Sequence, residues 1–185
     1  MVNRRLLPLC LFLLIFFNGK GQQVNTPLWL RYPAISPDGN TVVFSYKGDL
    51  YKVASKGGDA TILTTNPAYD FMPVWSPDGK TIAFASNRYG NFDIFTISAT
   101  GGSPTRLTFH SNNEYPSAFS PDGKSIIFSA QIQDNPKNIL FPNGLLTELY
   151  SIPVDGGRVK QILKPEQSSC FVHVGLWGKL LKFVS

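Results

Sequence analysis

The sequence has few cysteines and few histidines, and both scarcities limit its chemistry. Only two cysteines, Cys10 and Cys170, occur in the 185 residues. Once residues 1–21 are set aside for the reason given below, a single cysteine remains, so an internal disulfide is excluded. The two histidines, His110 and His173, lack the spacing of a metal site. We therefore expect no bound metal, and packing has to supply the stability of the fold.

The sequence also has few long segments free of glycine and proline, and few charged residues. The 16 glycines and 14 prolines leave few stretches of twelve residues free of both, which disfavours long helices. Charged residues make up 16% and aromatic residues 13%, a composition typical of a turn-rich β protein. The chain contains neither a G-x-S-x-G nucleophile elbow nor a glycine-rich phosphate loop. The sequence therefore predicts no catalytic residues and no cofactor.

The amino-terminal segment, residues 1–21, predicts a signal peptide. A basic start precedes the apolar run Leu6–Phe17, and Gly19 and Gly21 fit a small-x-small cleavage pattern. The run is shorter than the roughly 20 apolar residues that span a bilayer. An uncleaved anchor and a buried apolar strand are the alternatives. Export would place the mature chain, 22–185, in the periplasm or outside the cell, with no membrane span.

Charge gives no sign of a nucleic-acid partner. The segment before residue 22 holds three basic residues and no acidic one, so the net charge falls from +5 for the whole chain to +2 for the mature one. A balance this close to zero does not indicate binding to nucleic acid or to an anionic membrane.

Three short motifs recur in a fixed order. A Ser-Pro-Asp-Gly turn is followed by an acid that opens an aromatic strand, and then by a Gly-Gly pair. The acid precedes the pair by 8 residues in every unit. All variation in length falls between a recurrent phenylalanine and the acid, where the gaps are 5, 9 and 20 residues. The phenylalanines are Phe44, Phe84 and Phe128, and the acids are Asp49, Asp93 and Glu148. Fixed strands with insertions in one loop are typical of a repeat architecture.

Each unit divides into four short strands, which predicts an all-β fold. We expect a β-propeller of four-stranded antiparallel blades, in an incomplete ring of three blades and part of a fourth. The blades cover about residues 27–65, 66–108 and 109–163, and a degenerate fourth begins at 164–185. A stacked β-solenoid is the rival fold. An open array leaves a blade face in water, so we expect the chain to be marginally stable, oligomeric or aggregation-prone.

Recurrent residues have structural explanations in this fold. We expect Asp38, Asp78 and Asp122 to build the turns, and the recurrent acids to bind a loop amide. The three phenylalanines fill one core position in each blade. Ile35, Trp75 and Phe119 fill a second one.

The motifs of the second unit, "PVWSPDGKTIAF", "DIF", "GG" and "RLT", resemble the repeat of TolB-type propellers. They are also similar to the amino-terminal propeller of tricorn-type serine peptidases. The resemblance implies a non-catalytic propeller segment that gates peptides toward a catalytic domain of a longer chain, with a protein or peptide as partner. A TolB-like envelope interaction module and the propeller of a prolyl-oligopeptidase-like hydrolase are the alternatives. In each case this chain alone should not cleave peptides.

Antiparallel strands place the Pro-Asp-Gly and Gly-Gly turns at one end of the blades. The second-to-third-strand loops and the links between blades lie at the other end, which carries all the length variation. We expect a peptide or partner to bind there. The candidate residues are Tyr69, Asp70, Arg88, Tyr89, Asn91, His110, Glu114 and Tyr115. The alternative is that these residues solvate loops or cap blades.

Two further features of this end are left open by the sequence. Asp70 and Glu114 hold comparable positions and are candidates for a carboxylate pair. The apolar stretch 139–149 is either a lid or docking patch, or a longer hairpin.

Overall fold

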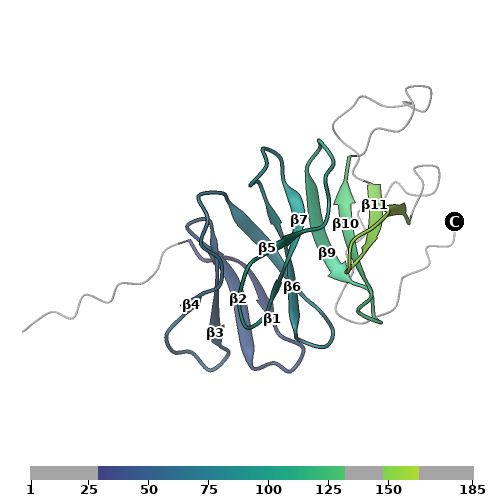
Figure 1. The fold of residues 1–185 in the computed structure, drawn as a ribbon. Coiled ribbons are helices and arrows are strands. Elements are labelled where there is room, and N and C mark those ends of the chain that lie inside the picture. Colours follow the sequence, from purple (N-terminus) through teal and green to yellow (C-terminus); the bar gives the residue numbers. More distant parts are fainter. Residues whose placement is uncertain (1–28, 132–147, 163–185) are drawn as a thin grey trace, which may run out of the picture.

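The computed structural model describes residues 29–131 and 148–162, which form three four-stranded antiparallel sheets (Figure 1). The first sheet contains β1 (Arg31–Ile35), β2 (Thr41–Tyr46), β3 (Asp49–Ala54) and β4 (Thr61–Ile62). The second contains β5 (Asp70–Trp75), β6 (Thr81–Ser86), β7 (Asp93–Ser98) and β8 (Thr105–Arg106). The third contains β9 (Glu114–Phe119), β10 (Ser125–Ala130), β11 (Glu148–Pro153) and β12 (Lys160–Gln161).

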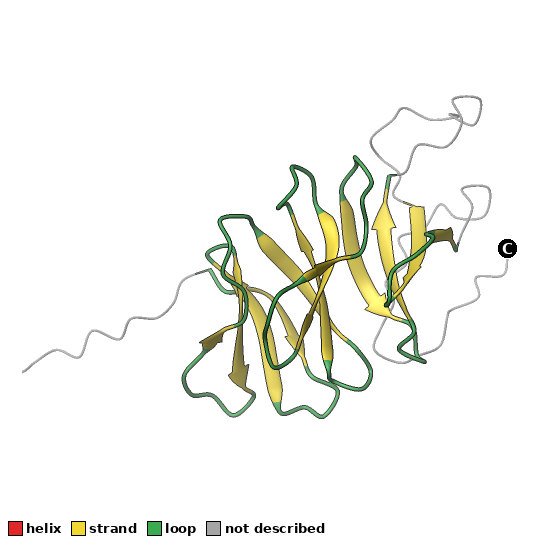
Figure 2. Cartoon of the chain, in the orientation of Figure 1, coloured by secondary structure: helices red, strands yellow, loops and turns green. Residues whose placement is uncertain are grey.

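The strands of each sheet are paired in chain order, so every sheet is a simple meander. The described residues contain strands and loops but no helix (Figure 2), and hence none that could cross a membrane. The three sheets stand side by side as radial blades of an unclosed ring, which confirms the predicted fold class. The predicted signal peptide, most of the 131–146 insertion and the degenerate fourth unit lie outside the described residues.

The turn between the first two strands of each sheet has the geometry that its sequence predicts. In the second sheet, the Ser76 hydroxyl donates to Asp78 Oδ1 over 2.6 Å and accepts from the Thr81 amide over 2.9 Å. Gly79 has a φ of 69°, in the left-handed region that glycine adopts easily. The same serine–aspartate hydrogen bond occurs in the other two sheets. The predicted turn role of the recurrent aspartates is therefore confirmed.

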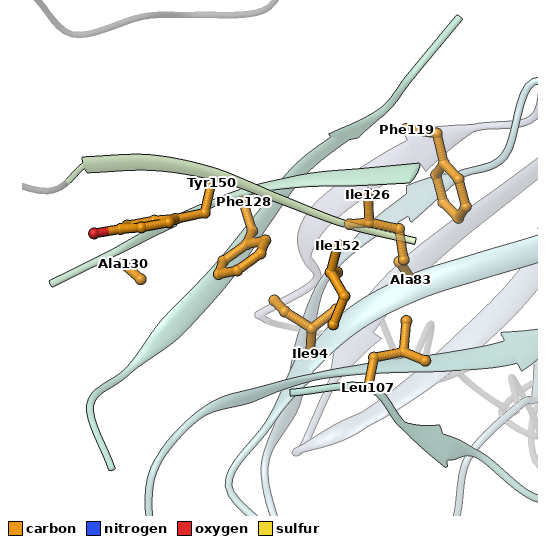
Figure 3. Packing of buried hydrophobic residues seen from close by; sticks show 9 residues of the cluster. All are labelled: Ala83, Ile94, Leu107, Phe119, Ile126, Phe128, Ala130, Tyr150 and Ile152. Carbon is orange, nitrogen blue, oxygen red and sulfur yellow. The ribbon is translucent and has the colours of Figure 1, made fainter. Parts of the chain in front are cut away.

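Two hydrophobic clusters hold the sheets together. The first lies between the first and second sheets, and the second lies between the second and third (Figure 3). Because side chains alternate along a strand, β6 directs Ile82 and Phe84 to the first cluster and Ala83 to the second. The predicted core role of the recurrent phenylalanines is confirmed, since Phe44, Phe84 and Phe128 are all buried.

The second predicted core position differs from sheet to sheet. Phe119 is buried against the second sheet, and Trp75 packs partly buried against the first cluster. The prediction for Ile35 is wrong, because this side chain is 50% exposed. This position faces the preceding sheet, and no sheet precedes the first one in the described residues.

Candidate functional site

The two ends of the sheets are distinct surfaces. We call the end that carries the β2–β3 and β6–β7 loops and the links between sheets the loop side. The opposite end, with the Pro-Asp-Gly and Gly-Gly turns, is the turn side. All eight candidate residues belong to loop-side segments or to the strand ends beside them.

An ion pair joins two of the predicted residues at the start of the second sheet. Arg88 Nη2 lies 2.7 Å from Oδ2 of Asp70, whose side chain is fully buried. Arg88 Nε also donates to the Ser86 hydroxyl over 3.1 Å. Its guanidinium carbon lies 5.8 Å from the ring centre of Phe84 and 5.3 Å from that of Phe95. These contacts make the pair part of the sheet rather than a free recognition group.

The β6–β7 loop is tied to the link that leads into the third sheet. Asn91 Nδ2 donates to the carbonyl oxygens of His110 and Asn112, over 2.8 and 2.9 Å. The Phe92 amide donates to Asn113 Oδ1 over 3.0 Å. These bonds fix Asn91 and the backbone of His110 in place. The loop side is therefore braced at this junction.

An aromatic cluster surrounds the buried ring of Phe71. The ring centres of Tyr32, Tyr69, Phe92 and Tyr115 lie 5.3, 5.4, 4.8 and 5.9 Å from it. Burial raises the pKa of Tyr115. Of the two predicted tyrosines in this cluster, Tyr69 is the more exposed one.

A buried acidic group lies between the second and third sheets. Glu114 is fully buried, and neither of its carboxylate oxygens has a hydrogen-bond partner among the described residues. Burial, and then the charge of Asp93, raise the pKa of Glu114 to about 7, whereas the nearby Thr108 hydroxyl and Arg106 lower it. Arg106 Nη2 lies 2.8 Å from Asp93 Oδ2. Burial also raises the pKa of Asp93.

These contacts answer the question of a carboxylate pair. Asp70 is bound by Arg88, and the carboxylate whose charge acts on Glu114 is Asp93. The two candidate acids therefore have separate partners.

The recurrent acids differ in the partners that they bind. Asp49 Oδ1 accepts from the Asn66 backbone amide over 3.2 Å, as predicted for a loop amide. Asp93 in addition forms an ion pair with a guanidinium group, and Glu148 accepts from the Tyr150 hydroxyl. The prediction therefore holds for Asp49 and also for Asp93, whose Oδ1 accepts from the side-chain amide of the loop residue Asn91 over 3.3 Å. The segment that follows β12 lies outside the described residues, so the loop amide expected for Glu148 stays a prediction.

The sequence analysis did not identify Arg106 and Phe109, which shape the loop-side surface together with the predicted Tyr89. The Arg106 guanidinium carbon lies 4.3 Å from the ring centre of Tyr89 and 4.7 Å from that of Phe109. Tyr89 is 64% exposed and Phe109 is 73% exposed. One signal was available, since β8 has Arg106 where β4 has the apolar Ile62. Two solvent-facing rings are thus held on one arginine.

A groove of about 640 Å³ lies on the turn side, between the first and second sheets. Trp75, Pro37 and Pro77 line it together with Asp38, Asp78 and Lys52. The sequence indicated the loop side as the binding face and did not indicate this groove. In residues 29–131 and 148–162, no group of three or more His, Cys, Asp or Glu side chains is arranged to hold a metal.

The radial four-stranded sheets, with their core between neighbours, define the class of protein as a β-propeller. Residues 27–172 match the family described as the tricorn protease N-terminal beta propeller domain. The chain belongs to this family.

Solved structures of several proteins are similar to the chain. A protein assigned as TolB from Agrobacterium tumefaciens is 27% identical with a TM-score of 0.61, over 76% of this chain and 50% of that protein. TolB from Acinetobacter baumannii is 22% identical with a TM-score of 0.59, over 74% and 33%. The tricorn protease is 15% identical with a TM-score of 0.50, over 67% and 13%. The last two matches show the fold alone, and the chain spans half or less of the length of all three proteins.

Proposed function

We propose that the chain is a non-catalytic propeller segment that binds a peptide or protein on its loop side. The observation that carries this proposal is the exposure of Tyr89 and Phe109, whose rings both lie beside the Arg106 guanidinium group. Aromatic residues and arginine are enriched in protein interfaces. Apolar rings directed into solvent at a braced loop are therefore suited to contact a partner.

The binding surface is fixed before a partner arrives. Arg106 is held by the buried carboxylate of Asp93 and in turn holds both rings through cation–π contacts. Because the rings are already oriented, less conformational entropy is lost on binding. Among the eight candidates, Tyr69 and Tyr89 supply exposed contacts, whereas Asp70, Arg88 and Glu114 position the loops.

Membership in the tricorn propeller family supports a role within a longer protein. We propose that the segment gates peptides toward a serine-peptidase domain and does not itself cleave them. A TolB-like interaction module and the propeller of a prolyl-oligopeptidase-like hydrolase are the alternatives. The gene sequence beyond the codon for Ser185 separates these readings, since a peptidase domain of tricorn type there supports the first and its absence contradicts it.

The proposal of export rests on the basic and apolar pattern of residues 1–21. Fusion of this segment to an alkaline phosphatase without its own signal tests it. Phosphatase activity in the periplasm is expected. Activity confined to unprocessed cytoplasmic protein would contradict export.

Fluorescence anisotropy with labelled β-casein, an unfolded polypeptide, tests the binding surface. We expect saturable binding that weakens by about tenfold in the Tyr89→Ala/Phe109→Ala double variant, since two exposed aromatic contacts together contribute about 1.4 kcal/mol. Trp29→Ala is the matched control, because Trp29 is 72% exposed and also lies over an arginine, Arg31. Equal affinity in all three proteins would overturn the proposal. Cleavage of the casein would contradict the non-catalytic role.

A further inference from the structure

The turn-side groove is built by two neighbouring sheets. The first sheet and its turns contribute Asp38, Lys52 and Asp59, and the second contributes Trp75 and Asp78. The groove lies at the end of the molecule opposite to the loop-side surface. It is therefore a separate candidate for binding.

A small residue, Ala99, lines the groove, and its counterpart in the third sheet, Val154, is larger. The Ala99 amide donates to the Lys80 carbonyl, and the Val154 amide makes the equivalent bond to Lys124 in the third sheet. The larger Val154 packs against the core cluster of its own junction. At the first junction, the smaller Ala99 also packs against its cluster and lines the groove. The first junction thus has two fewer side-chain carbon atoms at this position on the turn side than the second junction has.

The ammonium group of Lys52 spans this gap. Its Nζ donates to the Ala99 carbonyl oxygen over 2.8 Å, so the side chain is directed at the second sheet. The position of Lys52 in the first sheet is taken by Thr96 in the second. The cation that lines the groove is therefore already bound to the protein itself.

The lining has an excess of negative charge. Asp38, Asp59 and Asp78 face a single lining cation, Lys52, and the charge of Lys80 also acts on Asp78. Hydrogen bonds from serine hydroxyls lower the pKa of Asp38 to about 2 and lower that of Asp78, so both stay ionised at neutral pH. The hydrogen bonds of Asp78 all reach Oδ1, which leaves Oδ2 available to a ligand.

An aromatic ring lies beside these carboxylates. The Trp75 indole Nε1 donates to the Ala34 carbonyl oxygen over 3.0 Å, which fixes the ring across the junction. A tryptophan face attracts ammonium and guanidinium groups. The groove thus combines an oriented ring with carboxylates and two prolines, which suits an extended basic peptide.

We propose that this groove binds a basic polypeptide segment, with a lysine or arginine side chain over Trp75 and its charge against Asp78 and Asp59. The occupant is a polypeptide rather than a small molecule, because the ring, the carboxylates and the prolines line one groove that two sheets share. This inference does not depend on the loop-side function.

Tetra-arginine is the probe for the experiment, and tetra-glutamate is the probe of opposite charge. In a Trp29→Phe/Trp177→Phe background, Trp75 is the only tryptophan left. Saturable change of its fluorescence with tetra-arginine, and none with tetra-glutamate, is expected at low salt. The Asp59→Asn/Asp78→Asn double variant should bind tetra-arginine about tenfold more weakly, since two carboxylates are removed.

Asp122→Asn is the matched control. Asp122 makes the same turn hydrogen bonds as Asp78 but lies in the third sheet, away from the groove. An equal loss in this control, or equal binding of both probes, would overturn the proposal. Light scattering covers another occupant: a dimer that dissociates on Asp59→Asn/Asp78→Asn would assign the groove to a second copy of the chain and would also overturn it.

Discussion

We expect the protein to lose stability as pH rises through neutrality, and replacing Glu114 by Gln should remove most of this loss. Glu114 is fully buried, and neither of its oxygens makes a well-formed hydrogen bond among the described residues, although the nearby Thr108 hydroxyl lowers its pKa. Its pKa rises from 4.5 in the ordinary carboxyl to about 7 in the fold. Because the folded state holds the proton more tightly than the unfolded chain, the stabilisation is complete below pH 4.5 and is lost as pH rises through 7.

The size of the effect follows from the same values. A shift from 4.5 to about 7 corresponds to about 3 kcal/mol in the free energy of unfolding. Relaxation of the fold and entry of water around an ionised carboxylate reduce the cost of burying it, so we expect an effect of about 2 kcal/mol. Asp93 also has a raised pKa, so a smaller slope should remain in the variant.

Urea unfolding followed by circular dichroism between pH 5 and 8 measures this difference. The wild-type free energy of unfolding should fall across this range, and the Glu114→Gln curve should be nearly flat. Asp59→Asn is the control, since that side chain is exposed. If the wild-type and Glu114→Gln curves run parallel, the carboxyl group is not the source of the pH dependence and the reasoning is refuted.

Three further changes test other parts of the fold. Arg88→Ala leaves the buried Asp70 carboxylate unpaired and should destabilise the protein by about 3–5 kcal/mol in urea unfolding, with most of the loss recovered in Asp70→Asn/Arg88→Ala; no recovery would mean that the ring contacts of Arg88 matter more than its charge. Ser76→Ala removes the hydroxyl that bridges a turn and should lower the free energy of unfolding by about 1–2 kcal/mol, whereas an unchanged urea midpoint would contradict the turn assignment. Ile62→Arg should create, beside Asp49, an ion pair like the one between Arg106 and Asp93 in the second sheet, and should reduce the self-association that we expect to see in light scattering. Undiminished association would show that the exposed Ile62 side chain is not its cause.

The strands and turns could be predicted because their signals are local. Pro-Asp-Gly contains within three residues the fixed φ, the side-chain acceptor and the left-handed glycine that the hairpin requires. The burial of Ile35 could not be predicted, because it depends on whether another sheet lies against the first one. Core positions inside the array were predicted correctly for the opposite reason, since the repeat itself supplies their neighbours.

The loop side could be predicted only in outline. The comparable positions of Asp70 and Glu114 follow from the repeat, but their partners depend on where arginines stand on neighbouring strands. Exposure of Phe109 was not predicted, because Phe109 lies in the link between β8 and β9, where no strand alternation indicates which side chains face solvent. The groove was missed for a related reason, since its lining comes from the turns of two sheets and depends on how these sheets pack.

The pairing of the middle strands has a practical consequence. Strands β2 and β3 are separated by Lys47 and Gly48, whereas residues 131–147 separate β10 and β11. Both pairs nevertheless match six residues to six in unbroken register. Loop closure becomes less favourable by only about 0.6 kcal/mol for each doubling of length. The sheet thus tolerates long insertions at this loop. A foreign epitope inserted between β10 and β11 should be displayed without disturbing the pairing of the two strands.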